Sequence, residues 1–204
     1  MDINQFVASS FGQWRSQRSA HHLIFSHFEA VQSVIDIVAL APDDPLVLSL
    51  CQDYDIDPQK ISSPFRMSWE GQSDWNEDEP EELKGTTVLV PVPNLEFPNR
   101  GQLLRDRGYA ETMPAIGNYH FTEDGTFVLL TSYDRAAAEE KIWFVNPNLR
   151  FRVSTIKTSD GTGVVTASFS SEIRSLNRGN HLNLELKLCG HQAAIDVLQS
   201  GFNW

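Results

Sequence analysis

The chain has 204 residues, of which 27 are acidic and 16 are basic, so its formal net charge at pH 7 is −11. This length suffices for one domain with a sizeable core, and we expect a single domain over residues 1–204. A strongly acidic chain is repelled by a phosphate backbone, so nucleic acid is not an expected partner.

No stretch of the sequence has the pattern of a targeting or membrane segment. The first residues lack a basic start followed by an apolar core, and no run of about 18 apolar residues occurs. We therefore expect a protein without membrane contact that stays in the cytosol or its plastid equivalent. The two cysteines, Cys51 and Cys189, lie far apart without CxxC or His-rich spacing, which predicts reduced thiols and no metal site.

Two helices are expected in the first part of the chain. Asp2 can cap a short amphipathic helix that ends near residue 12, and we expect this helix to act as a plug or lid. Extended stretches follow at residues 12–25 and 32–40. Asp44 and Pro45 then predict the start of an inserted helix with one apolar face.

The remainder of the chain up to residue 174 is predicted to consist mainly of strands. They are expected at residues 65–71 and 73–75, 85–92, 115–122, 126–134, 141–146, 149–154 and 167–174. The acidic run 77–82 is expected to be a solvated loop, 99–109 a turn with a short helix at the rim, and 135–140 a helix-prone linker. Residues 175–204 are compatible with one further strand and a helix or with a poorly ordered extension.

The order of these strands predicts an all-β fold. About nine strands in antiparallel neighbour-to-neighbour order, without βαβ units, indicate an up-and-down barrel or a sandwich, and the meander favours the barrel. Gly12-x-Trp14 on the first strand, after an N-terminal helix, resembles the start of a lipocalin. In that fold the tryptophan packs against a basic side chain of the last strand, and Arg174 is the candidate for this cation–π contact.

One predicted hairpin places charged residues on a single face of the sheet. Arg150 and Arg152 alternate with apolar residues, so both point to the same side. A turn about Gly161 sets Arg150 opposite Glu172 and Arg152 opposite Ser170. This face is either a solvated exterior with a weak surface ion pair or the lining of a polar cavity, and periodicity does not decide between the two.

Seven short motifs, taken together and in order, resemble the S-type phycobiliprotein lyases over residues 1–174. These motifs are Gly12-x-Trp14 with Ser16-Gln17-Arg18, His21-His22, the run 85–93, Arg100-Gly101-x-Leu103-Leu104-Arg105, Gly108-Tyr109-Ala110-Glu111, the run 143–152 and the run 168–174.

The resemblance implies a lipocalin-like barrel of about ten strands that binds an open-chain tetrapyrrole, chiefly phycocyanobilin, as its substrate. The protein would attach this bilin through a thioether to a cysteine of an apo-phycobiliprotein subunit of the phycocyanin, allophycocyanin or phycoerythrin type. No permanently bound cofactor is implied. The expected location becomes a cyanobacterial cytoplasm or a plastid stroma, and whether the chain works alone or as a homo- or heterodimer with a related lyase stays open.

Carried over position by position, the resemblance implies that Arg150 holds a propionate and Glu172 meets the pyrrole nitrogens, with Arg152 as a second cation. Four further residues would flank the pocket, namely Arg18, His21, Trp69 and Trp75. The structural alternative is that the tryptophans belong to the core and that His21 is a strand-surface residue.

The implied mechanism needs no nucleophile from this chain, because a bilin adds thiols by itself and the protein controls its shape and surroundings. Glu172 could also keep the pyrrole system protonated. The alternative function is a lipocalin-like carrier that binds an amphipathic carboxylate without catalysis. A scaffold without a ligand is disfavoured, because unpaired inward charges are costly.

Overall fold

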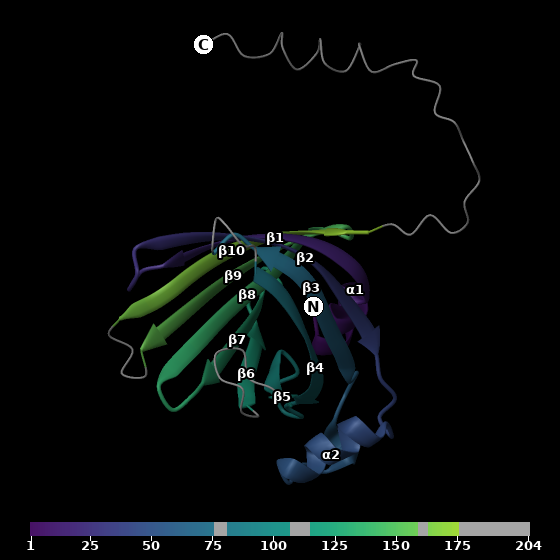
Figure 1. The fold of residues 1–204 in the computed structure, drawn as a ribbon. Helices are drawn as coiled ribbons and strands as arrows, with labels where there is room; N and C mark the ends of the chain where they lie inside the picture. Colours follow the sequence, from purple (N-terminus) through teal and green to yellow (C-terminus); the bar gives the residue numbers. More distant parts are fainter. Residues whose placement is uncertain (76–80, 107–114, 159–162, 176–204) are drawn as a thin grey trace, which may run out of the picture.

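The computed structural model describes residues 1–75, 81–106, 115–158 and 163–175. Ten antiparallel strands form a closed barrel in which each strand pairs with its sequence neighbours and β1 pairs with β10 (Figure 1). The strands are β1 (Gly12–His22), β2 (His27–Ala39), β3 (Phe65–Ser73), β4 (Glu81–Pro93), β5 (Arg100–Arg105), β6 (Ala115–Phe121), β7 (Phe127–Ser132), β8 (Ala136–Asn146), β9 (Leu149–Thr158) and β10 (Val164–Arg174). The prediction of an all-β up-and-down barrel is confirmed.

The N-terminal helix α1 (Ile3–Ser10) closes one end of the barrel, as predicted for a plug. Asp2 starts the helix through a capping box, in which its carboxylate accepts from the backbone N–H of Gln5 at 2.9 Å. Phe6 on the buried face stacks on Phe127 with ring centroids 4.4 Å apart. The apolar face of α1 therefore belongs to the same core as the barrel interior.

The inserted helix α2 (Pro45–Asp53) lies outside the barrel and forms a second, smaller core. Asp44 caps it and Pro45 opens it, as the sequence predicts. Its buried face, which includes Cys51, covers apolar residues on the outer side of β4 and β5. A short 3-10 helix, Pro58–Lys60, follows before β3. No helix in the described ranges is long and apolar enough to cross a membrane.

The other end of the barrel carries the tip of the β1–β2 hairpin in place of a helix. In Figure 1 this tip lies at the left, together with the end of β9 and the start of β10, whereas α1 lies at the right. The backbone N–H of Leu23 donates to the carbonyl of Val165 at 2.9 Å, which joins the two hairpins there. We call this end the mouth of the barrel.

Two predicted interruptions of the sheet are wrong. Residues 100–105 form β5 and not a turn with a short helix, because Leu103 and Leu104 are both buried, one on each side of the sheet. Residues 136–140 belong to β8 and not to a helix-prone linker, since pairing with β7 and β9 outweighs the weak helix preference of alanine.

The acidic run is a loop only in part. Glu81 and Glu82 lie in β4, and residues 77–80 lie outside the described part of the chain, as do residues 107–109 of the segment predicted at the rim. Residues 176–204 and Cys189 lie outside it too.

The predicted hairpin has the predicted register. Arg150 pairs with Glu172 and Arg152 with Ser170, while the turn that was expected at residues 159–163 lies mostly outside the described residues. The register shifts by one near Val164, so the pairing expected from the turn holds for the described pairs from Thr166 to Ile173.

Candidate functional site

Five charged residues of alternating sign lie on the inner faces of β5, β8, β9 and β10, and we call them the charge ladder. They are Arg105, Glu140, Arg152, Glu172 and Arg150. Arg105 Nη1 lies 3.8 Å from Glu140 Oε2, and Glu140 Oε1 lies 3.4 Å from Arg152 Nη1. Arg152 Nε lies 3.2 Å from Glu172 Oε1, and Glu172 Oε2 lies 2.5 Å from Arg150 Nε. The inner, cavity-lining alternative for the hairpin face is therefore the correct one.

The ladder is deeply buried. Arg150 and Glu172 are each only 1% exposed. Burial by itself raises the pKa of Glu172, but the charges of Arg152 and Arg150 outweigh it and hold this pKa below its usual range. Burial lowers the pKa of Arg150, against the opposing effect of Glu172. Both groups are charged at neutral pH.

The charges of the ladder do not cancel. Three guanidinium groups face two carboxylates, which leaves one excess positive charge inside the barrel. Taking a charge out of water costs several kcal/mol unless a partner compensates it. The excess charge therefore favours an anionic ligand at this position.

Unpartnered hydrogen-bond donors point to the same conclusion. Within the described residues, Arg150 Nη2, Arg105 Nε and the hydroxyl of Tyr119 are buried without a hydrogen-bond partner. A buried donor that lacks an acceptor costs about 1–3 kcal/mol. A cavity of about 50 Å³ lies between the ladder and α1 and is bordered by Arg150 and Arg105. An acceptor group of a ligand placed there would remove part of this cost.

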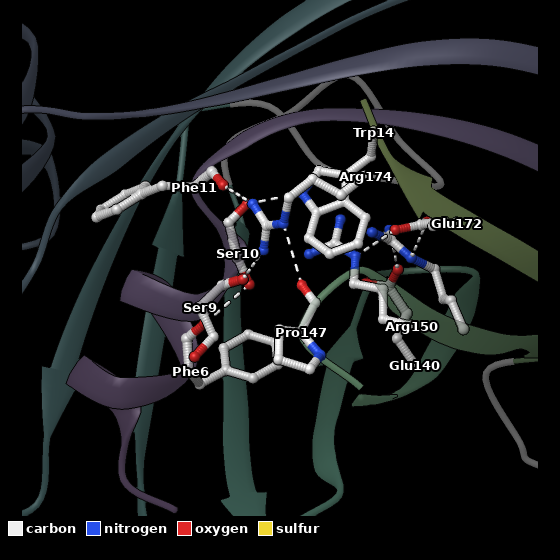
Figure 2. A network of polar contacts seen from close by, with 11 residues as sticks. Phe6, Ser9, Ser10, Phe11, Trp14, Glu140, Pro147, Arg150, Glu172 and Arg174 are labelled. Carbon is white, nitrogen blue, oxygen red and sulfur yellow. Dashed lines mark hydrogen bonds and ion pairs between the residues drawn. The ribbon is translucent and has the colours of Figure 1, made fainter. Parts of the chain in front are cut away.

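Trp14 supports the ladder from the closed end of the barrel (Figure 2). Its ring lies between two guanidinium groups, with the Cζ of Arg150 at 4.4 Å and the Cζ of Arg174 at 4.1 Å from the ring centroid. The indole Nε1 donates to the carbonyl of Ser10 at 2.8 Å. The predicted contact between Arg174 and Trp14 is thus confirmed, and the ring also fixes one face of Arg150.

Arg174 ties the end of α1 to the barrel. Its guanidinium donates to the carbonyls of Ser9 at 2.7 Å, of Pro147 at 3.0 Å and of Phe11. The carbonyls of Ser9 and Phe11 lie at the C-terminal end of α1, where carbonyl groups lack helical partners. The plug is therefore held by a residue of the same strand that carries Glu172.

A second polar group, which we call the mouth cluster, lies further toward the mouth. It consists of Arg18, His22, Glu29 and Ser73. Glu29 accepts from Ser73 Oγ at 2.6 Å and lies 2.9 Å from His22 Nε2 and 3.5 Å from Arg18 Nη2. Burial raises the pKa of Glu29, but the hydrogen bonds from Ser73 and His22 outweigh it, so this pKa lies below its usual value.

The structure places six of the seven predicted site residues on the inner side or at the mouth. Arg150, Glu172 and Arg152 belong to the ladder, and Arg18 belongs to the mouth cluster. Trp75 stacks edge-on against His22, with centroids 4.7 Å apart. Trp69 packs at the edge of the interior core, against Gly85 of β4.

The prediction that His21 flanks the pocket is wrong. His21 is exposed on the outer face of β1 and contacts Phe28, which is exposed as well. The strand alternates strictly from the buried Trp14 onward, so even-numbered residues point inward and the inner histidine is His22.

Three other interior residues were missed in the sequence. Glu140 was assigned to a helical linker, Arg105 to a turn, and Glu29 to no element at all. A signal for Glu140 does exist, because Ala138, Glu140 and Ile142 alternate with charged residues as expected of a strand. Nothing local distinguishes Arg105 or Glu29 from a surface charge.

A larger hollow in the described residues lies elsewhere. It measures about 1190 Å³ and covers the outer side of β10, β1, β2, β3 and β4. Its wall consists largely of outward polar side chains such as Gln13, Arg15 and Gln17, and it contains no member of the charge ladder. The chemistry is concentrated inside the barrel, and we place the site there.

Comparison with known proteins agrees with this fold. Residues 2–175 match the family model described as CpeS-like protein. The chain is 61% identical over 175 residues to chromophore lyase CpcS/CpeS 3 of Trichodesmium erythraeum, covering 86% of this chain and 100% of that protein. The solved structure of the S-type phycobiliprotein lyase CPES from Guillardia theta is 48% identical, with a TM-score of 0.74, and the match covers 86% of this chain and 93% of that one.

Two further relatives carry names that specify a bilin. A protein of Microchaete diplosiphon with the provisional name of phycoerythrobilin lyase CpeS is 64% identical over 160 residues, which cover 78% of this chain and 71% of that protein. The phycocyanobilin lyase subunit CpcS of Picosynechococcus is 37% identical over 174 residues, which cover 85% of this chain and 87% of that protein. The chain belongs to the CpeS-like family of chromophore lyases.

Proposed function

We propose that the protein binds an open-chain tetrapyrrole inside the barrel and attaches it, through a thioether, to a cysteine of an apo-phycobiliprotein subunit. The names of the relatives support this activity. The observation that carries the assignment of the site is the charge ladder, with its excess positive charge and its unpartnered donors. A bilin offers two propionates and a row of pyrrole nitrogens, which complement arginine and glutamate respectively.

A propionate of the bilin binds at Arg150. The cavity beside the ladder, about 50 Å³, exceeds the roughly 10–15 Å³ that a cavity needs to hold one water molecule, so it has room for a carboxylate but not for four pyrrole rings. Arg150, whose Nη2 donor is unpartnered, and Arg105, whose Nε donor is unpartnered, both line it. The rings must then extend away from α1, toward the mouth.

Small side chains line this path. At the next level of the barrel, inward positions on β1, β10 and β9 are Ala20, Ser168 and Ser154, which pair side by side. Glu140 pairs with Ser154 on the neighbouring strand, and with Glu172 it supplies carboxylates that can accept from pyrrole N–H groups. In this proposal Arg150 binds the propionate near α1, and the carboxylates of Glu172 and Glu140 accept from the pyrrole N–H groups beside it.

In this proposal the chain contributes no thiol to the transfer. Of its two cysteines only Cys51 lies in the described residues; it is buried on the inner face of α2, outside the barrel, and burial raises the pKa of its thiol. The bond therefore forms on the acceptor's cysteine, while the barrel holds the bilin in one shape and keeps water away from it. Phycoerythrobilin is the preferred substrate in this proposal, since the relative named for it is 64% identical and the one named for phycocyanobilin is 37% identical.

The acceptor subunit docks at the mouth, because α1 blocks the other end and the thiol must reach the bilin. The β1–β2 tip exposes three consecutive apolar residues there, Leu23 at 51%, Ile24 at 66% and Phe25 at 70%. A turn that exposes several large apolar side chains is a typical feature of an interaction surface. This tip is the contact that we assign to the acceptor.

A titration of the protein with free-acid and dimethyl-ester phycoerythrobilin tests the site. The ester is neutral and cannot replace the carboxylate partner of Arg150, so it should bind at least tenfold more weakly, as judged from the change in bilin absorbance. Arg150→Lys keeps the charge but loses the planar fork, and it should reduce this discrimination. Arg15→Lys, on the outer face of β1, is the matched control and should behave as the unmodified protein does.

Transfer to apo-phycoerythrin separates the two function hypotheses. A lyase yields a bilin that stays on the acceptor under denaturing conditions, whereas a carrier of amphipathic carboxylates binds the bilin without transferring it. Equal affinity for free acid and ester would contradict the placement of a propionate at Arg150. Binding without covalent transfer would contradict the lyase assignment.

A further inference from the structure

The mouth cluster contains a histidine–carboxylate pair that the binding of a propionate at the ladder does not use. His22 Nε2 lies 2.9 Å from Glu29 Oε2, and Glu29 is itself fixed by Ser73 Oγ at 2.6 Å and by Arg18 at 3.5 Å. Glu29 is buried, whereas the side chain of His22 keeps 22% exposure. The pair thus combines a rigid carboxylate with an imidazole that solvent and an incoming group can reach.

The hydrogen bond determines which nitrogen of His22 can act as a base. A carboxylate only accepts, so in the neutral imidazole the proton lies on Nε2 and points to Glu29. Nδ1 then carries the lone pair. When Nδ1 takes up a proton, the negative charge of Glu29 stabilises the imidazolium that forms, as the carboxylate does in a catalytic triad.

The location of His22 matches the place where the thiol must arrive. Ser16 pairs with Glu172 at the level of the ladder, and His22 follows six residues later on the same strand, about 20 Å toward the mouth. The next residues, Leu23 to Phe25, form the exposed tip, and Phe25 and His22 both contact Trp75. A bilin anchored at Arg150 and extended to the mouth ends beside this pair.

We infer that His22 is the general base that removes the proton from the acceptor's thiol, with Glu29 as its positioning residue. This inference rests on the proposed function. In the step, His22 Nδ1 takes the proton of the S–H bond and the sulfur attacks the exocyclic ethylidene carbon of the bilin. The C–S bond forms, the π bond breaks, and a proton returned from the imidazolium or water completes the C–H bond. No oxidant or reductant is required.

Several charged and neutral groups surround the pair of His22 and Glu29. The titratable and charged groups that face His22 are Glu29 and His27 of β2 and Arg18 of β1, with Ser73 of β3 and Trp75 as neutral neighbours. Arg18 lies 3.5 Å from Glu29, while His22 is hydrogen-bonded to the same carboxylate at 2.9 Å. The ring centroid of His27 lies 4.3 Å from that of Trp75, and among the described residues its Nε2 is buried without a hydrogen-bond partner.

The test compares His22→Gln with His21→Gln at two pH values. An ordinary thiol of pKa about 8.5 is about 3% ionised at pH 7 and about 75% ionised at pH 9. His22→Gln should therefore transfer phycoerythrobilin to apo-phycoerythrin about 10- to 30-fold more slowly at pH 7, but less than about threefold more slowly at pH 9. His21→Gln, on the outer face, should match the unmodified protein at both pH values. Glu29→Gln should show the pattern of His22→Gln to a smaller extent.

Bilin affinity and the pH dependence distinguish the outcomes. The affinity of His22→Gln for the bilin, measured by absorbance, should stay within about twofold of the unmodified protein. A rate deficit of the same size at pH 7 and pH 9, or a loss of bilin affinity that accounts for the slower rate, would overturn the role as a base. Transfer by the unmodified protein with no effect of His22→Gln would overturn this inference alone. Absence of transfer by the unmodified protein would instead overturn the proposed function.

Discussion

Glu172 accepts from two arginines in the barrel interior, and this environment makes it unlike the surface glutamates of the same protein. Arg150 and Arg152 lie 2.5 and 3.2 Å from its two oxygens, whereas Glu70 meets Lys84 at 3.3 Å with both side chains about three-quarters exposed. Removal of one partner from a buried pair leaves an uncompensated charge and costs about 3–5 kcal/mol, while an exposed pair contributes about 0–1 kcal/mol.

Glu172→Gln should therefore lower the free energy of unfolding at pH 7 by about 3–5 kcal/mol, as measured by urea denaturation. The fold lowers the pKa of Glu172, so its contribution is complete above the unfolded pKa of about 4.3 and is lost as the pH falls through the folded pKa. The difference between the two proteins should accordingly shrink below about pH 4.

Glu70→Gln is the matched control, and it should change the free energy of unfolding by less than about 1 kcal/mol at pH 7. An equally small effect of Glu172→Gln would show that the ladder contributes no more than a surface ion pair. A difference that persists unchanged to pH 3 would show that the carboxylate charge is not the cause.

At the scale of elements, the β1–β2 hairpin carries two separate features. Its strand part holds His22 and Glu29 on the inner face, and its tip exposes Leu23, Ile24 and Phe25. Ser26 has a φ of +48°, a left-handed conformation that turns the chain back into β2. Because the apolar side chains lie in the turn, they contribute little to the barrel core. Substitutions there should therefore weaken binding of the acceptor subunit and leave the fold intact.

The double change Ile24→Asn with Phe25→Ser should raise KM for apo-phycoerythrin about tenfold or more and leave the affinity for phycoerythrobilin unchanged. The reason is that, in the proposed function, the acceptor docks at the tip whereas the bilin lies inside the barrel. Leu130→Asn replaces another exposed apolar residue, on the outer face of β7, and should leave both quantities unchanged. An unchanged KM in the double variant would move the acceptor contact away from this tip.

At the scale of the whole molecule, the two ends of the barrel differ. The plug α1, Trp14 and Arg174 close the end at which we propose that a propionate binds to Arg150. The small interior residues Ala20 and Ser168 lie between that end and the mouth. Room for the ligand thus depends on the interior volume of the complete barrel and not on any single strand.

Ser168→Phe should reduce phycoerythrobilin affinity at least tenfold, because a ring at this inward position fills the path of the tetrapyrrole. Ser171→Phe places the same ring on the outer face of β10 and should leave the affinity unchanged. Binding is measured by absorbance titration, and circular dichroism verifies that both variants fold. Equal binding by the two variants would exclude the interior path between Ser168 and the mouth.

Much of the fold can be predicted from the sequence by itself, because its determinants are local. The cap at Asp2, the proline at the start of α2 and the alternation along β9 each depend on residues a few positions apart. The pairing of Arg150 with Glu172 also follows from one hairpin. The resemblance to the S-type lyases then adds the expected ligand and activity, which periodicity cannot supply.

Only the tertiary structure decides which face of each strand is inside and which distant charges meet. Alternation is the same for a barrel lining and an outer face, so His21 and His22 cannot be assigned until β1 pairs with both β10 and β2. Arg105 and Glu140 meet because closure of the barrel brings the inner faces of β5 and β8 together. Closure also overrides the helix preference of residues 136–140, because strand pairing on both sides satisfies backbone groups that a short helix would leave to solvent.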